Sequence, residues 1–127
     1  MSRKTINIPP ISLSATLTTN LLNCGVTAMT GPVGMTISQP VLYIRHIHFV
    51  NTDTVARNFS LFKGATGANA AGTQFVGTAK VIAANDVYDY WAGGDGDRFD
   101  STDFLVGGAD SAGKIIMKVD AEIGISG

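Results

Sequence analysis

The two histidines of the chain stand two residues apart in the segment RHIHFVNTD, residues 45–53. In a β-strand, positions i and i+2 point to the same side, so His46 and His48 could face one metal ion. A transition-metal site in a β-barrel needs a third and usually a fourth ligand. Asp53 or the aspartates around residue 100 could supply one, but the chain has no third histidine. The sequence therefore favours two partly buried or interface imidazoles over a metal site.

A second group of possible ligands lies in GGDGDRFDSTD, residues 93–103, which includes Asp95, Asp97 and Asp100. Calcium prefers such oxygen-rich turns. The EF-hand loop needs ligands at alternate positions and a glutamate at its twelfth position, and Arg98 interrupts the series here. We therefore favour a solvated turn whose aspartates cap their own backbone, with a calcium site as the alternative.

Motifs for other common chemistries are missing from the sequence. There is no Gly-x-Ser-x-Gly nucleophile elbow and no Walker-type phosphate loop. Glu122 is the only glutamate, so two glutamates cannot share acid–base catalysis. Tyr88, Tyr90 and Trp91 could stack on a sugar, but strand alternation separates Trp91 from the tyrosines and favours core and interface roles. We expect no enzymatic activity and no cofactor.

The composition fits one domain that binds neither nucleic acid nor a membrane. The 127 residues carry a net charge of −1 and no Lys/Arg cluster that could neutralise many phosphates. No apolar run of about 18 residues could span a membrane, and no signal peptide is recognisable. The single cysteine, Cys24, cannot form an internal disulfide. We expect the chain to fold in a reducing cytoplasm.

Strands dominate the predicted secondary structure. Fifteen glycines and many β-branched residues favour strands over helices. In residues 114–126 the odd positions are apolar and the even positions mostly polar, which is the period of a strand with one buried face. Seven to eight strands separated by Gly, Asn and Asp turns predict an all-β fold, an antiparallel β-sandwich or jelly roll, over residues 13–127.

Residues 1–12 are predicted to form an extended N-terminal arm. Two adjacent prolines favour an extended path, and the isoleucines beside them must lie against the domain or a neighbour. We interpret the arm as a strap onto a neighbouring subunit. Its contact residues would be Ile6, Ile8, Pro9, Pro10 and Ile11.

The strand predicted over residues 41–52 is apolar on both of its faces. A strand in a two-layer sandwich needs only one apolar face, so the second face must meet an arm, a loop or another subunit. We expect self-association through the face that carries Leu42, Ile44, His46 and His48.

Residues 41–126 resemble small β-sandwich virion proteins of tailed bacteriophages. The similarity lies in a strand that ends in Phe-Val-Asn-Thr (residues 49–52), in the turn before Val-Tyr-Asp (residues 87–89), and in the alternating C-terminal strand. The Asp/Gly-rich insertion at residues 93–113 departs from the pattern of that family.

The resemblance implies a capsid decoration (cement) protein or a minor head or tail protein, assembled in the host cytoplasm and resident in the virion. Its partners would be the major capsid protein and copies of itself, with a trimer favoured among homo-oligomers. Two alternatives remain open: a tail or fibre component of the virion, and a soluble carbohydrate-binding or cupin-like β module.

Overall fold

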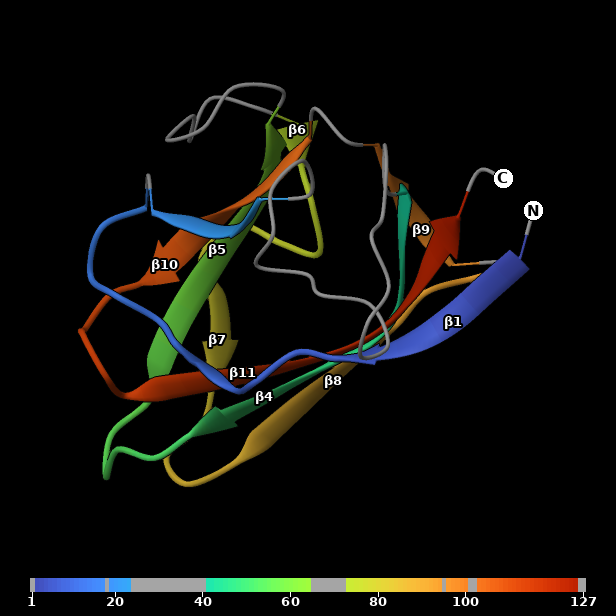
Figure 1. Ribbon diagram of the computed structural model, residues 1–127. Helices are drawn as coiled ribbons and strands as arrows, with labels where there is room; N and C mark the ends of the chain where they lie inside the picture. The colour runs from blue at the N-terminus through green and yellow to red at the C-terminus, as the bar shows by residue number, and fades with distance from the viewer. Residues whose placement is uncertain are drawn as a thin grey trace.

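The computed structural model describes residues 2–17, 19–23, 41–64, 73–94, 96–100 and 103–125. These residues form two antiparallel sheets that pack face to face (Figure 1). The strands are β1 (Ser2–Asn7), β2 (Ile11–Ser12), β3 (Asn20–Asn23), β4 (Val41–Asn51), β5 (Arg57–Gly64), β6 (Thr73–Gln74), β7 (Lys80–Ile82), β8 (Val87–Trp91), β9 (Asp97–Phe99), β10 (Phe104–Ala109) and β11 (Ile115–Ile125). The predicted β-sandwich is confirmed.

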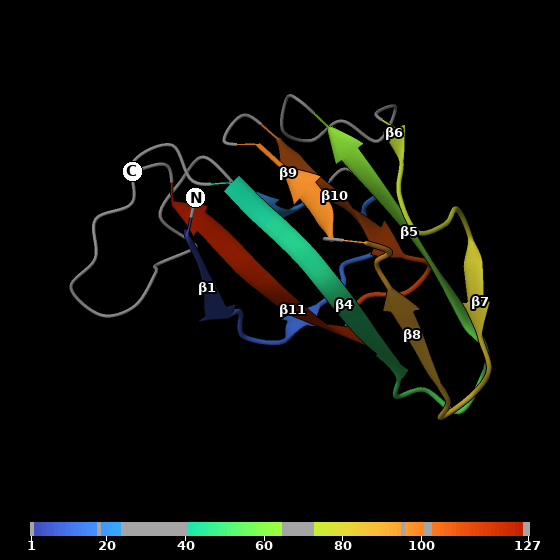
Figure 2. The same cartoon turned by 90° about the vertical axis from the view of Figure 1, so that its right-hand side faces the viewer.

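The first sheet follows the order β1-β11-β4-β8, with β2 added beside β11 and β9 beside β4 (Figure 2). The second sheet follows the order β3-β10-β5-β6, and β7 pairs with β5. The predicted seven to eight strands were too few, because nine of the described strands have three residues or more. The described ranges hold no helix, and hence no helix long and apolar enough to cross a membrane.

The core lies between the two sheets. Phe49 of β4 stacks on Phe59 of β5, with ring centroids 4.0 Å apart, and so links the two sheets across the core. The C-terminal strand β11 alternates as predicted, because Ile115, Met117 and Val119 are all fully buried. This alternation leaves the even positions of β11 on the outer face of the first sheet.

A β-bulge at Arg45 reverses the side-chain alternation along β4. Asp120 of β11 lies opposite His46, but the next residue, Ala121, lies opposite Ile44. Arg45 is therefore the additional residue of the bulge. Such an insertion moves every side chain beyond it to the other face of the sheet.

Because of the bulge, the four residues expected to form one self-association face do not lie on the same face of the sheet. Leu42 and Ile44 are 0 % exposed and belong to the core, as do Ile47 and Phe49 on the other side of the bulge. His46 is only partly buried and lies on the outer face, together with His48. Strict alternation grouped Leu42 and Ile44 with the histidines, because no residue type in this stretch signals the extra residue.

The N-terminal segment also needs correction as a separate arm. Residues 2–7 are extended, as predicted, but they form β1. The whole of β1 pairs with the second half of β11, from Ser2 opposite Ile125 to Asn7 opposite Asp120. The boundary predicted at residue 12 is therefore not a boundary of the sheet, since β2 also pairs with β11. The N- and C-terminal strands lie side by side at one edge (Figure 1).

Ile8 is 4 % exposed and belongs to the protein's own core, so its expected contact with a neighbouring subunit is wrong. Pro9 and Pro10 are exposed and Ile11 is half-buried, which leaves these three residues accessible. The side chain of Ile6, like Cys24, lies outside the described part of the structure.

A buried amide fixes the end of β4. Asn51 is 0 % exposed, and its Nδ2 donates hydrogen bonds to the backbone oxygens of Val55, Ile82 and Ala83 at 3.0, 3.0 and 3.2 Å. Its Oδ1 accepts a hydrogen bond from Asp53 N at 3.0 Å. The side chain thereby ties β4 to the turn before β5 and to the last residue of β7 and the residue that follows it.

Candidate functional site

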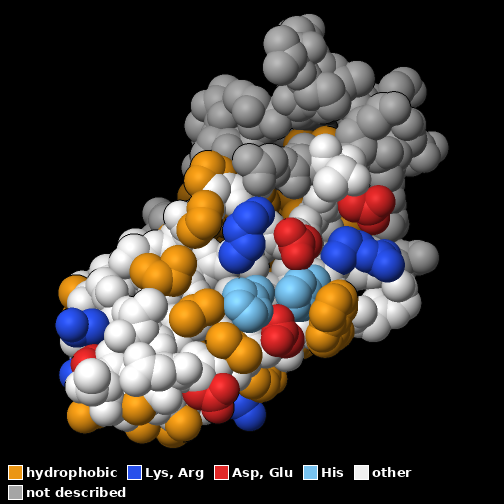
Figure 3. Space-filling model, turned by 90° about the horizontal axis from the view of Figure 1, so that it is seen from below, with side chains coloured by type: hydrophobic (Ala, Val, Ile, Leu, Met, Phe, Trp, Pro, Cys, Tyr) orange, Lys and Arg blue, Asp and Glu red, His pale blue; other side chains and the backbone are white. Residues whose placement is uncertain are grey.

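Ionisable side chains gather at the centre of the outer face of the first sheet. The backbone register places His46 of β4 between Trp91 of β8 and Asp120 of β11. Two residues along, His48 of β4 lies opposite Asp89 of β8. Seen from this side, the two histidines lie next to each other with acidic side chains close by (Figure 3). We call His46, His48, Asp89 and Asp120 the His–Asp cluster.

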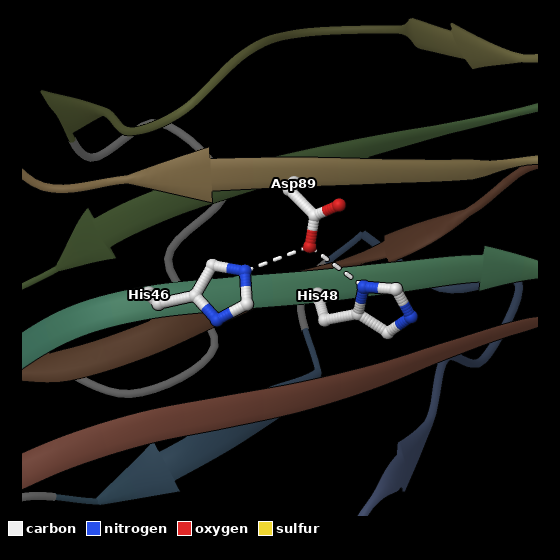
Figure 4. A group of neighbouring side chains, drawn as sticks. All are labelled: His46, His48 and Asp89. Atoms are coloured by element: carbon white, nitrogen blue, oxygen red, sulfur yellow. Dashed lines mark hydrogen bonds and ion pairs between the residues drawn. The ribbon is translucent and has the colours of Figure 1, made fainter.

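One carboxylate oxygen of the cluster contacts both imidazoles. Asp89 Oδ1 is 2.7 Å from His46 Nε2 and 2.7 Å from His48 Nδ1 (Figure 4). On the opposite side of the His46 ring, Nδ1 is 3.0 Å from Asp120 Oδ2. A carboxylate accepts hydrogen bonds, so both nitrogens of His46 can donate only when the ring is an imidazolium. His46 therefore suits the position of a cation between two anions.

Trp91 covers the His46 ring. The two rings are stacked, with centroids 3.9 Å apart and an interplanar angle of 15°. The side chain of His46 is 14 % exposed, whereas Trp91 is 70 % exposed. The indole thus lies mostly in solvent while it limits the access of water to the imidazole. An imidazolium beneath an aromatic ring also gains a cation–π attraction.

The cluster shifts the pKa of two of its members. Burial lowers the pKa of His46, but the hydrogen bonds to Asp120 and Asp89 outweigh this effect and raise the pKa above its ordinary value near 6.5. Hydrogen bonds from His48, which has the larger effect, and from His46 lower the pKa of Asp89. Both shifts favour the charged partners, and these charge pairs stabilise the contacts of β4 with β8 and β11.

Nucleophilic catalysis has no support in this arrangement. The hydrogen bonds described for the two imidazoles all lead to carboxylate oxygens, not to a hydroxyl or thiol that they could activate. An open depression lies on the same face, lined by Thr5, Arg45 and Glu122 together with residues 120–121. The cluster can instead hold charge, or it can offer two imidazole nitrogens and a carboxylate to a metal ion.

The predicted histidine pair is present, but its acidic neighbour differs from the candidates named from the sequence. Asp53 binds Arg57, with Oδ2 at 2.7 Å from both Nε and Nη2 of the guanidinium. Hydrogen bonds from Arg57 and from the backbone of Thr54 lower the pKa of Asp53. Asp53 therefore belongs to the turn after β4 and not to the His–Asp cluster.

The acidic segment of residues 93–103 shows no gathering of its described carboxylates around a common point. Asp97 accepts a hydrogen bond from the Tyr90 hydroxyl at 2.6 Å, and Asp100 accepts one from Arg98 Nε at 2.7 Å. Burial, together with Asp97, raises the pKa of Tyr90 to about 12. Asp95, the third calcium candidate, lies outside the described residues.

The candidate ligands predicted from the sequence did not include the cluster's two carboxylates, Asp89 and Asp120. The predicted alternation did place Asp89 and Trp91 on one face, and the structure confirms this, because Tyr88 and Tyr90 turn toward the core. Only the pairing of β8 with β4 brings Asp89 to the histidines, and strand order could not be read from the sequence.

Comparison with known proteins gave no relative for this chain. No family model matches it, and neither a curated protein nor a solved structure does. Its function must therefore be argued from the fold and the site.

Proposed function

We propose that this protein is a non-enzymatic structural protein of a tailed-phage virion, specifically a capsid decoration (cement) protein that binds the assembled head. The resemblance of residues 41–126 to small β-sandwich virion proteins supports this proposal, and so does the all-β sandwich itself. A fold alone does not determine a function, so a feature of the surface must carry the argument.

The exposed Trp91 is that feature. A tryptophan that is 70 % exposed costs free energy in water, and tryptophan is among the residues that contribute most to protein–protein contacts. Its ring is held flat on His46 and so loses little conformational freedom when a partner covers it. Val87, which is 47 % exposed, lies on the same face of β8 and extends the apolar surface.

A partner that covered Trp91 would also cover the His–Asp cluster beneath it. The cluster pairs its charges internally, with His46 between Asp89 and Asp120, so a partner need not supply counter-charges. A decoration protein stabilises a shell because it binds the assembled state alone and thereby shifts the assembly equilibrium. Several copies joined around a symmetry axis would add avidity, and a trimer of this chain on the major capsid protein is the arrangement we favour.

Binding to particles tests the proposal. Particles that lack this protein are mixed with purified wild-type chain, with Trp91→Ser or with Val81→Ser, and sedimented. Val81 is a matched control because it is 64 % exposed but lies on β7 of the second sheet. We expect saturable binding of the wild type and of Val81→Ser, and at least about tenfold weaker binding of Trp91→Ser.

Absence of wild-type binding to heads would overturn the decoration role. Binding to tails alone would favour the tail or fibre alternative. Quenching of Trp91 fluorescence by a sugar, without particle binding, would favour a carbohydrate-binding module. A cupin-like module has less support, since both histidines lie on the outer face of a sheet and not between the two sheets.

A further inference from the structure

We propose that His46, His48 and Asp89 form a binding site for a divalent transition-metal ion of the zinc and copper class. One atom from each residue can act as a ligand, and these three atoms all lie within 4.8 Å of one another. This inference goes beyond the structural role proposed above and does not depend on it.

The strand geometry directs the three ligands to one point. His46 and His48 both follow the bulge at Arg45 and project from the outer side of β4. Asp89 projects from the neighbouring strand, directly opposite His48. Figure 4 shows the carboxylate above the space between the two rings, in contact with one nitrogen of each. Two imidazoles and one carboxylate are a ligand set that zinc uses when its fourth position holds water.

Asp120 and Trp91 position the central ligand. Asp120 Oδ2 lies 3.0 Å from His46 Nδ1 and can accept a hydrogen bond from its N–H, while Nε2, which faces Asp89 and His48, releases its proton when it binds the ion. Metal-binding histidines usually donate their second ring N–H to a carboxylate or carbonyl, and such a partner fixes the ring orientation. The stacked indole of Trp91 restrains the same ring from its face. Asp120 thus occupies the position that the second partner of a metal-binding histidine usually takes.

The other two ligands can adjust to an ion. The side chains of His48 and Asp89 are each 37 % exposed, so they can move where His46 cannot. A tetrahedral zinc ion with bonds of about 2.0–2.1 Å keeps its ligand atoms about 3.4 Å apart. Asp89 Oδ1, now 2.7 Å from each ring nitrogen, would move outward by several tenths of an ångström to admit the ion.

The surrounding charges are compatible with a bound cation. Asp89 and Asp120 supply two negative charges beside the ion. Lys118 of β11 carries a positive charge that would repel a bound cation. Its Nζ, however, donates a hydrogen bond of 2.7 Å to the backbone oxygen of Ile8 and lies 3.9 Å from Asp120 Oδ1, which offsets its charge. Arg45 is directed toward Glu122, at 3.9 Å. The ligand set selects against calcium and magnesium, which prefer oxygen ligands throughout.

Titration with the metal alone tests the proposal. The full chain, freed of metal with a chelator, is titrated with ZnCl2 in a calorimeter and with CuCl2 while tryptophan fluorescence is followed. Trp91 is the only tryptophan and lies against His46, so copper bound in the cluster quenches its emission. We expect one saturable site for each metal and no response to MgCl2.

Variants assign the site to its residues. His48→Gln and Asp89→Asn should each weaken zinc binding by at least about tenfold, and Asp120→Asn by about 10- to 100-fold through loss of positioning. Asp100→Asn, an exposed carboxylate outside the cluster, is the matched control and should bind as the wild type does. Cys24→Ser should also bind normally, which excludes the one thiol of the chain as the ligand.

Circular dichroism shows that each variant is folded before its affinity is compared. His48 and Asp89 are both partly exposed, so their substitution leaves the core intact. The proposal is overturned if neither zinc nor copper binds saturably, or if His48→Gln and Asp89→Asn bind as tightly as the wild type.

Discussion

Asn51 offers a sharp test of how β4, the strand that carries both histidines, is held in place. Its side chain is 0 % exposed and makes all of its described hydrogen bonds to the backbone. Substitution Asn51→Leu keeps a side chain of similar size but removes both the donor and the acceptor. The buried or partly buried carbonyl oxygens and the N–H group that it served then lose their partner.

The expected loss in the free energy of unfolding follows from the number of hydrogen bonds that Asn51→Leu removes. The two Nδ2 hydrogens serve three carbonyl oxygens, so two full donated bonds and one accepted bond are lost. At about 1 kcal/mol for each net bond, the free energy of unfolding falls by about 3 kcal/mol. In a domain of this size that corresponds to a decrease in Tm of about 10 °C. Asn51→Asp should be more harmful still, since a carboxylate would face carbonyl oxygens.

Urea denaturation followed by circular dichroism measures this change. The matched control is Thr52→Val, because Thr52 Oγ1 donates one hydrogen bond of 2.8 Å to Lys114 O at an exposed site. We expect the control to lose less than about 1 kcal/mol. An unfolding free energy of Asn51→Leu within about 1 kcal/mol of the wild type would refute the role of Asn51 as the tie at the end of β4.

Three further predictions concern other parts of the sandwich. Tyr90→Phe should remove the phenolate absorbance step near pH 12 from a spectrophotometric titration, because the pKa of Tyr90 is raised to about 12; an unchanged step would contradict this assignment. The lowered pKa of Asp53 means that its pairing with Arg57 stabilises the fold above the ordinary value of 3.8 and is lost as the pH falls through the folded pKa. The stability difference between wild type and Asp53→Asn should therefore shrink on acidification below about pH 4, and a constant difference would argue against it. Gly107→Ala should prevent folding, since a Cβ there would overlap the backbone oxygen of Ser60; a soluble variant with native circular dichroism would show that β10 can move away.

The local alternation of strands could be predicted well where one face is buried and the other is solvated. Residues 114–126 showed the period of two, and β11 indeed buries its odd positions from Ile115 to Ile123. The same reasoning failed in β4, because the bulge at Arg45 changes the pairing without a sequence signal of its own. Leu42 and Ile44 were consequently assigned to the wrong face.

Strand β10 could not be predicted because its glycines suggested a loop. Residues 93–113 were interpreted as an Asp/Gly-rich insertion, yet Phe104–Ala109 form a strand between β3 and β5. Gly107 and Gly108 are needed there because neighbouring backbone approaches them too closely for any side chain. The glycines thus marked a close approach within a sheet.

The candidate site was predictable in half of its members. Histidines at i and i+2 indicated one face of a strand, and that expectation is confirmed. Asp89 and Asp120 join them only through the pairing of β4 with β8 and β11, which are distant in the sequence. Asp53, five residues after His48, was the nearer candidate in the sequence but turns toward Arg57.

The proposed decoration role is tested most directly by counting copies of this chain in purified particles of a tailed phage whose genome carries its coding sequence. Absolute peptide quantification gives the ratio of this chain to the major capsid protein. A decoration role predicts a copy number of the same order as that of the major capsid protein. The fixed ratio between the two would also identify the symmetry sites that this chain occupies. A few copies per particle would contradict decoration and favour the tail, and absence of the chain from the virion would contradict the structural role altogether.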